Sequence, residues 1–172
     1  RYSLAQRDYL RTTFINGRHS DDDRIIQLIE IYNKGEVPEV SDKEQIRLLL
    51  ILFSWVLTSS NRWLRDTTSK AMIEILKDHF EYTEYLLKLF SDVNDPYVIQ
   101  RLYRIAFGAC VKRNYENKET FKSLVCFVFE DIFNKDMIYP DILLRDYARL
   151  IIERYLMEYP GELQDYEFEK IK

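Results

Sequence analysis

The sequence predicts an all-α protein, and three observations carry that prediction. The chain of 172 residues has only four glycines, its apolar residues recur with helical periodicity, and capping or turn residues separate the periodic segments. Tight hairpins and phosphate-cradling loops depend on glycine for backbone conformations that other residues resist. The low glycine content therefore disfavours an all-β fold and a nucleotide-binding α/β domain.

Residues 2–17 and 22–34 are expected to form the first helix pair. The second of these helices opens on Asp21-Asp22-Asp23 and closes at Gly35. Carboxylates in a first turn offset the helix dipole. We interpret the triplet as a solvated N-cap, since it lacks the spaced ligands and the glycine of a calcium loop.

A linker at residues 35–41, GEVPEVS, precedes a helix expected at 42–58, and Ser41 with Glu44 has the spacing of a capping box. Leu48–Leu57 is the most apolar stretch, but it is far shorter than the about 20 residues that cross a bilayer. We interpret it as a fully buried core helix and expect no membrane segment. Five more helices are expected at 62–79, 81–91, 96–113, 118–134 and 142–158, followed by a tail at 159–172.

Three of these helices align as an internal repeat. The capping residues Asn61, Asp95 and Asp141 are equivalent, and the positions behind them keep the i, i+4, i+7, i+8 spacing of one helix face. The aligned positions are Leu64, Val98 and Leu144; Thr68, Leu102 and Ala148; Ala71, Ile105 and Ile151; Met72, Ala106 and Ile152; and Leu76, Cys110 and Leu156.

Copies spaced by 34 and 46 residues fit helix-pair repeats that stack into solenoids. The predicted fold is an α-solenoid of about four stacked antiparallel helix pairs. It forms a single helical-repeat domain over residues 1–172, with the first pair in 1–34 and three pairs in 42–158.

No motif for catalysis, cofactor binding or metal binding stands out. The sequence lacks GxxxxGK[ST], GxGxxG, HExxH and GxSxG. His19 and His79 have no Cys or His at metal-ligand spacing, and Cys110 and Cys126 lack the CxxC spacing. We therefore expect no catalytic, cofactor or metal site, and two thiols kept in a reducing compartment, the cytoplasm.

Two acidic pairs are candidate general acids and bases. Glu81 with Glu84 and Asp131 with Asp136 are the nearest candidates. In a chain with 29 acidic residues such pairs are usually solvated helix faces, and we interpret them so.

Charge is unevenly distributed along the chain. A net charge of −4 gives no general reason to expect binding to a phosphate backbone. The three aligned helices, however, carry eleven basic and seven acidic residues, against fourteen and twenty-two elsewhere. Arginines recur in their first two turns, off the apolar stripe: Arg62, Arg65, Arg101, Arg104, Arg145 and Arg149.

Two interpretations of these arginines stay open. They form a basic ridge that holds an acidic peptide or a phosphate backbone, or they form a structural ladder with pairs such as Asp66 with Lys70 and Asp146 with Arg149. Aromatic residues are candidate anchors on the same surface, with a core or rim role as the alternative for the tryptophans: Trp55, Trp63, Tyr97, Tyr103 and Tyr147.

The run DPYVIQRLYRIAFGACV at 95–111 resembles the second helix of a HEAT repeat. The usual Val-Arg adjacency is broken because Ile99 follows Val98, and the other two copies lack the Asp-Pro opening. The residues that match the pattern are Asp95, Pro96, Val98, Arg101 and Ala106.

Three longer segments, at 59–76, 92–111 and 143–160, are similar to parts of the helical C-terminal regions of bacterial STAND-type ATPases with NACHT-like motors. In antiviral members of that group such regions bind a phage protein and trigger oligomerisation. The resemblance implies a HEAT-like architecture and a sensor role, with any ATPase domain elsewhere in a longer parent. The start at Arg1 and the end in EFEKIK also lead us to expect a piece of a longer protein.

The predicted function is therefore a non-catalytic protein-interaction module. Its expected partners are a protein with an acidic surface or peptide and the other domains of the parent chain. One alternative is a nucleic-acid-binding domain similar to the HEAT-like alkylpurine DNA glycosylases, with Trp63 and Asp66 as candidates, although the overall acidity disfavours it. Another is a purely structural spacer.

Overall fold

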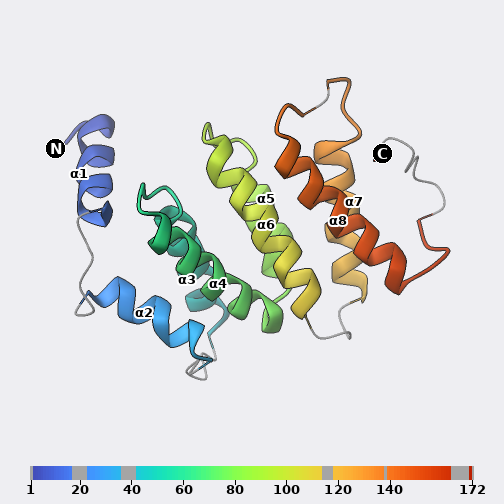
Figure 1. Ribbon diagram of the computed structural model, residues 1–172, viewed down its shortest axis with the longest axis horizontal. Helices are drawn as coiled ribbons and strands as arrows, with labels where there is room; N and C mark the ends of the chain where they lie inside the picture. The colour runs from blue at the N-terminus through green and yellow to red at the C-terminus, as the bar shows by residue number, and fades with distance from the viewer. Residues whose placement is uncertain are drawn as a thin grey trace. The chain divides into compact units, whose positions relative to one another are not determined.

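The computed structural model describes residues 2–16, 23–35, 42–113, 118–137, 139–163 and 171. Within these residues it has eight α-helices and no β-strand, which confirms the prediction of an all-α protein (Figure 1). The helices are α1 (Leu4–Asn16), α2 (Arg24–Asn33), α3 (Lys43–Val56), α4 (Arg62–Asp78), α5 (Tyr82–Phe90), α6 (Pro96–Lys112), α7 (Lys118–Ile132) and α8 (Ile142–Glu158).

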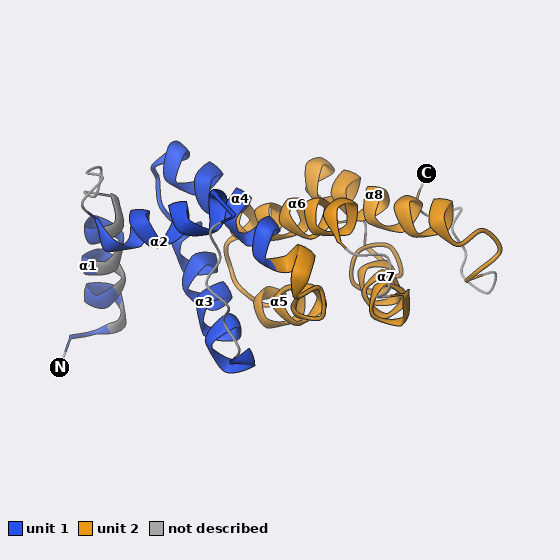
Figure 2. Cartoon of the chain, turned by 90° about the horizontal axis from the view of Figure 1, so that it is seen from below, with its two compact units in different colours: residues 1–75 blue, residues 76–172 orange. Residues whose placement is uncertain are grey.

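The chain forms two compact units, residues 1–75 and 76–172 (Figure 2). The first unit contains α1–α3 and most of α4, and the second contains the end of α4 and α5–α8. In the second unit α6 and α8 pack side by side in one layer, while α5 and α7 lie in a layer behind them (Figures 1 and 2). Successive helices there alternate between the layers, so short connections suffice without a central sheet.

Side-chain caps begin the three aligned helices at the residues that the sequence predicts. Each cap accepts a hydrogen bond from a first-turn backbone N–H: Asn61 from Leu64 at 3.3 Å, Asp95 from Val98 at 3.2 Å and Asp141 from Leu144 at 3.0 Å. These N–H groups have no partner within their own helix, so the caps stabilise the helix starts.

The aligned apolar stripe is buried in all three helices. Fourteen of its fifteen residues are at most 2% exposed. The exception is Leu156, which is half-buried, whereas Tyr155, one residue earlier on α8, is fully buried. The repeat is therefore a pattern of core residues, each worth about 1.5–3 kcal/mol when a large aliphatic side chain is fully buried.

Asp141 also joins α8 to α6. Gln100 donates from Nε2 to both carboxylate oxygens of Asp141, at 3.0 and 3.1 Å. The same carboxylate caps the first turn of α8. One side chain thus fixes where α8 begins and which part of α6 it faces.

Asp141→Ala is expected to lower the free energy of unfolding by about 1–2 kcal/mol, because it removes the cap and leaves the Gln100 amide without its acceptor. Urea unfolding followed by circular dichroism measures the change. Asp136→Ala is the matched control, since this exposed carboxylate precedes α8 without capping it, and its effect should stay within about 0.5 kcal/mol. Equal effects of the two substitutions would contradict the double role of Asp141.

The start of α3 differs from the prediction. Its N-cap is Asp42, whose carboxylate accepts a hydrogen bond from the Glu44 N–H at 2.9 Å, and Ser41 lies outside the described residues. The Glu44 side chain accepts a bond from Arg47 Nε at 2.8 Å. The N-cap of α3 is therefore Asp42, which accepts the bond from the Glu44 N–H that the predicted capping box assigns to Ser41.

A capping box that the sequence analysis missed begins α1. Ser3 Oγ accepts from the Gln6 N–H at 3.3 Å, and Gln6 Oε1 accepts from the Ser3 N–H at 2.9 Å. The Ser-x-x-Gln spacing was the available signal.

The acidic triplet caps α2 as predicted, but its capping carboxylate is buried. Asp23 accepts from the Ile25 N–H at 2.9 Å and is 4% exposed, so the solvated N-cap prediction is wrong at this residue. Asp21 and Asp22 lie outside the described residues. Gly35 ends the helix at φ +72°, a backbone conformation that favours glycine, and it follows α2 as expected.

The prediction of a fully buried helix over Leu48–Leu57 is wrong. Leu50 and Phe53 are fully buried, and Phe53 packs edge-on against Tyr32 of α2 with ring centroids 6.1 Å apart. Three other apolar residues, at i, i+4 and i+7, stay 41–54% exposed: Leu48, Leu52 and Trp55. That spacing places them on one helix face, so α3 has apolar residues on its exposed face as well as on its core face.

Candidate functional site

The first two candidate arginines lie on α4, in the first unit. The Arg62 side chain is 86% exposed, and its Nε lies 3.5 Å from the Asp66 carboxylate. Arg65 donates from Nη1 to the backbone carbonyl of Ser59 at 2.5 Å, so it ties α4 to the connection before it. Asp66, for which the sequence suggested Lys70 as a partner, thus lies beside Arg62.

The next two candidates lie on α6. Arg101 is only 7% exposed. Its Nη2 donates to the Tyr97 hydroxyl at 3.1 Å, and its guanidinium carbon lies 5.2 Å from the centre of the Tyr97 ring. Arg101 therefore serves the packing of α6 and presents little charge to solvent, whereas Arg104 is exposed.

The last two candidates, on α8, line a common pocket. Arg149 donates to Asp146 at 2.6 Å and to Glu153 at 2.8 Å, which confirms the predicted pairing of Asp146 with Arg149. Arg145 is half-buried, and among the described residues its side chain has no carboxylate partner. The pocket has a volume of about 190 Å³ and is lined by Phe133, Ile142, Arg145, Asp146, Arg149 and Ile171. We call it the α8 pocket.

The structure brings these arginines into different surroundings. Arg62 and Arg149 have acidic neighbours on their own helices, as the ladder interpretation expects. Only Arg145 combines a cavity, apolar neighbours and a charge without a carboxylate partner in the described part of the chain. It is the strongest candidate for binding a ligand.

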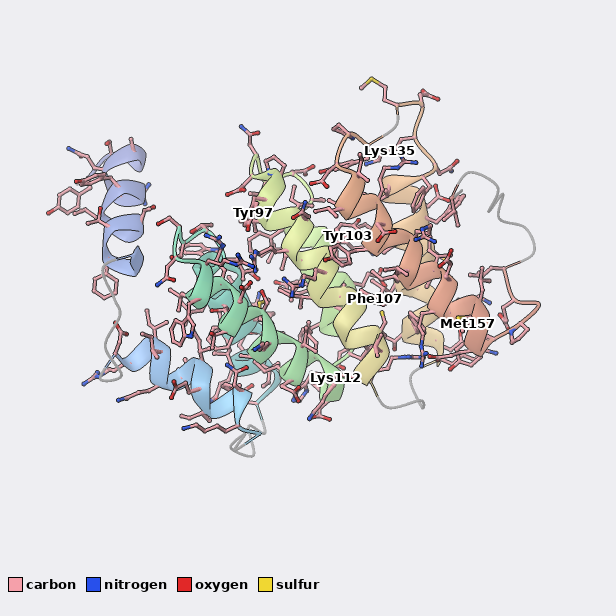
Figure 3. The ribbon with its side chains drawn as sticks, in the orientation of Figure 1. Tyr97, Tyr103, Phe107, Lys112, Lys135 and Met157 are labelled. Atoms are coloured by element: carbon pink, nitrogen blue, oxygen red, sulfur yellow. The ribbon has the colours of Figure 1, made fainter. Side chains whose placement is uncertain are left out.

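The candidate aromatic anchors differ in their exposure to solvent. Trp55 and Trp63 are about half exposed, and Tyr97 lies exposed near the start of α6 (Figure 3). Tyr103 is 1% exposed, and its hydroxyl donates to Asp131 on α7 at 2.8 Å. Burial and the Asp131 carboxylate raise the pKa of Tyr103. Tyr103 therefore cannot act as a surface anchor, and it links α6 to α7 instead.

Two of the four candidate acids, Asp131 and Glu84, contact basic residues. Asp131 accepts from Tyr103 and, at 2.8 Å, from Lys135. Glu84 lies 2.5 Å from Lys88. Burial raises the pKa of the Cys110 thiol, which keeps it protonated and unreactive.

Other kinds of site find no support in the described residues. No group of three or more His, Cys, Asp or Glu side chains is placed there to hold a metal ion. None of the helices in that part of the chain has the length and apolarity needed to cross a membrane. His79 is half-buried, and His19 lies outside the described residues.

Three residues of the α8 pocket were missed by the sequence analysis. Phe133 follows α7, Ile142 begins α8 and Ile171 lies in the predicted tail. Ile142 directly follows the cap Asp141 and falls off the apolar stripe, which was a signal of an exposed apolar residue. Nothing in the sequence indicated that Ile171 lines the same pocket.

Comparison with known proteins gives no relative: no protein-family model, no curated protein and no solved structure matches this chain.

Proposed function

We propose that this chain is a non-catalytic protein-interaction module that binds an acidic segment of a protein partner at the α8 pocket. The observation that carries the proposal is Arg145, whose charge has no carboxylate partner among the described residues and which lines an open pocket together with three apolar residues, Phe133, Ile142 and Ile171. Partly buried charges in proteins are normally paired. A carboxylate from a partner protein would pair with the Arg145 guanidinium.

The size of the pocket supports recognition of a protein side chain. Pockets for small molecules and cofactors measure about 300–1,000 Å³. The α8 pocket, at about 190 Å³, is smaller than that range. It suits a single anchoring side chain of a partner, the arrangement in which a few residues contribute most of the binding energy.

The wider setting we propose is an α-solenoid that forms the ligand-sensing part of a bacterial antiviral STAND ATPase, working in the cytoplasm. Its support is the resemblance of residues 59–76, 92–111 and 143–160, together with the two-layer packing of α5–α8. The full coding sequence tests this setting: a GxxxxGK[ST] loop upstream of residue 1 is expected, and a complete reading frame without one would contradict it.

Arg145→Glu is expected to weaken binding of acidic peptides at least tenfold, because it replaces attraction at the pocket with repulsion. Randomised peptides displayed on phage are selected against the unaltered chain, sequenced and then titrated by fluorescence anisotropy. Arg62→Glu is the matched control, since it reverses an arginine of the first unit that is 86% exposed, and it should bind as the unaltered chain does. Circular dichroism checks that both variants keep their helices.

Two outcomes would overturn the proposal. One is selection of peptides without enrichment in Asp and Glu, and the other is binding that Arg145→Glu leaves unchanged. Tight binding of duplex DNA with a steep salt dependence would instead favour the nucleic-acid alternative. In that case the exposed Trp63, together with Asp66, would be the residues to substitute next.

A further inference from the structure

The helices α6 and α8 are aligned copies of one repeat, and they lie side by side in one layer of the second unit. Both begin at an aspartate cap, Asp95 and Asp141, and both bury the aligned stripe. They also run in the same direction (Figure 1). Because the two helices turn the same face towards the layer behind them, the side of α6 that faces α8 is equivalent to the side of α8 that faces away from α6.

The side of α6 that faces α8 has an amide and two aromatic residues. Gln100 bonds to Asp141 at the start of α8, and Tyr103 and Phe107 follow Gln100 with the i+3 and i+7 spacing of one helix face (Figure 3). Tyr103 is 1% exposed, and Phe107 is half-buried. We call these three residues the α6 row, and the row carries no charge of its own.

The equivalent row of α8 is charged at all three positions. Asp146, Arg149 and Glu153 stand at the same distances from the cap of α8 as the α6 row does from the cap of α6. Arg149 donates to Asp146 at 2.6 Å and to Glu153 at 2.8 Å, and the three side chains are 38–46% exposed. The three charges of this α8 row therefore pair with one another and stay in contact with water.

A further helix packed on the α8 row would take two carboxylates and one guanidinium out of water. The attraction within buried ion pairs offsets that loss of hydration only when additional hydrogen bonds satisfy the remaining polar atoms. An apolar helix face offers no such bonds. Terminal repeats of stacked helical proteins need a polar outer face to stay soluble, and the α8 row provides one.

We propose that α8 is the capping helix of its layer. The α8 row prevents another apolar helix, including one from a second copy of this chain, from packing on the outward face, and it leaves that face to hydrated, charged protein segments. Two members of the row, Asp146 and Arg149, also line the α8 pocket, so the site of the proposed function lies on the same face. The inference goes beyond the proposed function and does not depend on it, since it concerns what the face excludes.

The test gives α8 the residues of the α6 row. In the triple variant Asp146→Gln, Arg149→Tyr and Glu153→Phe the outward face of α8 becomes apolar. We expect the full chain carrying it to self-associate about tenfold or more tightly than the unaltered chain does, because burial of added aromatic area favours association. Sedimentation velocity over a range of protein concentrations measures the association, and circular dichroism checks that the variant keeps its helices.

A matched control is available on α2. Gln27, Glu30 and Lys34 have the same spacing as the α8 row, and Glu30 and Lys34 form a surface pair with side chains 38% and 61% exposed. Glu30→Tyr with Lys34→Phe therefore creates the same Gln-Tyr-Phe row on a helix of the first unit. This control measures the association that two added aromatic side chains cause by themselves, and it should stay within about threefold of the unaltered chain.

Equal association of the triple variant and the α2 control would overturn the inference, because the charges of the α8 row would then not be what keeps the face open. So would an unaltered chain that already associates as tightly as the triple variant. If the triple variant loses helicity, Arg149→Leu with Glu153→Leu replaces it, with Glu30→Leu and Lys34→Leu as the control. The α8 version should still associate about threefold more tightly than the α2 version, and no difference between them would also overturn the inference.

Discussion

Glu158→Ala is expected to lower the free energy of unfolding by about 3–5 kcal/mol, because it breaks a buried ion pair with Arg113. Its partner Arg113 has a side chain only 1% exposed. Without Glu158 a buried guanidinium loses a carboxylate partner, and less of its desolvation is offset.

The surroundings of Arg113 explain why the pair matters to the second unit. Arg113 follows α6, donates to the Cys110 carbonyl at 2.7 Å and binds both carboxylate oxygens of Glu158 on α8. Its guanidinium carbon lies 4.0 Å from the centre of the Phe121 ring on α7. One side chain thus joins the ends of three helices.

Chemical unfolding of Glu158→Ala measures the loss. Glu153→Ala is the matched control, because Glu153 is also an acid of α8 but pairs on the surface with Arg149 of the same helix, and it should cost about 0.5 kcal/mol or less. The double variant Arg113→Met with Glu158→Leu should recover most of the stability, since it removes both charges and keeps apolar volume. Similar losses for Glu158→Ala and Glu153→Ala would contradict this account.

The pair of Arg113 and Glu158 also predicts how the difference in unfolding free energy between the unaltered chain and Glu158→Ala depends on pH. Burial by itself raises the pKa of Glu158, but the hydrogen bond and charge of Arg113, with the charge of Arg154, bring it below its ordinary value of 4.5. A carboxyl with a lowered pKa contributes fully above the unfolded-state value and loses that contribution as the pH falls through the folded-state value. The stability gap between the unaltered chain and Glu158→Ala should therefore narrow as the pH is lowered below about 4.5.

Leu50→Ala is expected to cost about 2–5 kcal/mol, whereas Leu48→Ala, two residues earlier in the same helix, should change stability by no more than about 0.5 kcal/mol. Leu50 is fully buried and leaves a cavity when it is truncated, but Leu48 is 54% exposed. The two substitutions make the same change of side chain, one on the buried face of α3 and one on its exposed face.

Thermal and urea unfolding of both variants, followed by circular dichroism, check this prediction. Equal losses would restore the original interpretation of Leu48–Leu57 as a helix buried on all sides. A loss confined to Leu50→Ala would support the one-sided burial of α3.

The sequence predicted the helices well where local chemistry decides. Asn61, Asp95 and Asp141 satisfy backbone donors of their own helices, and capping depends on residue type and spacing alone. The aligned stripe was predictable for a similar reason, since a period of 3.6 residues identifies the face that must be buried. Both depend on neighbours in the sequence.

Predictions that depend on neighbours in space were less secure. Arg101 stands in the first two turns of α6 like the other candidate arginines, yet it is buried against Tyr97. Leu48 and Leu50 are the same residue type with opposite burial. Periodicity shows which residues share a face, but not which faces another element covers.

The candidate site shows the same limit. Arg145 was predicted as one of six equivalent arginines, and nothing local to α8 sets it apart. Its distinction comes from Phe133 and Ile171, which reach the pocket from a connection and from the predicted tail. Contacts between segments so far apart in the sequence leave no periodic signal.

The bond between Gln100 and Asp141 has a consequence for how this chain can vary in evolution. The hydrogen bonds from Gln100 on α6 hold the first turn of α8 in place. The connection between α7 and α8 therefore does not need a fixed length to position α8. Its residues 134–137 are all exposed. Insertions and deletions at 134–137 can therefore accumulate without shifting α8 along α6, whereas a single-residue deletion inside α6 would rotate Gln100 away from its acceptor.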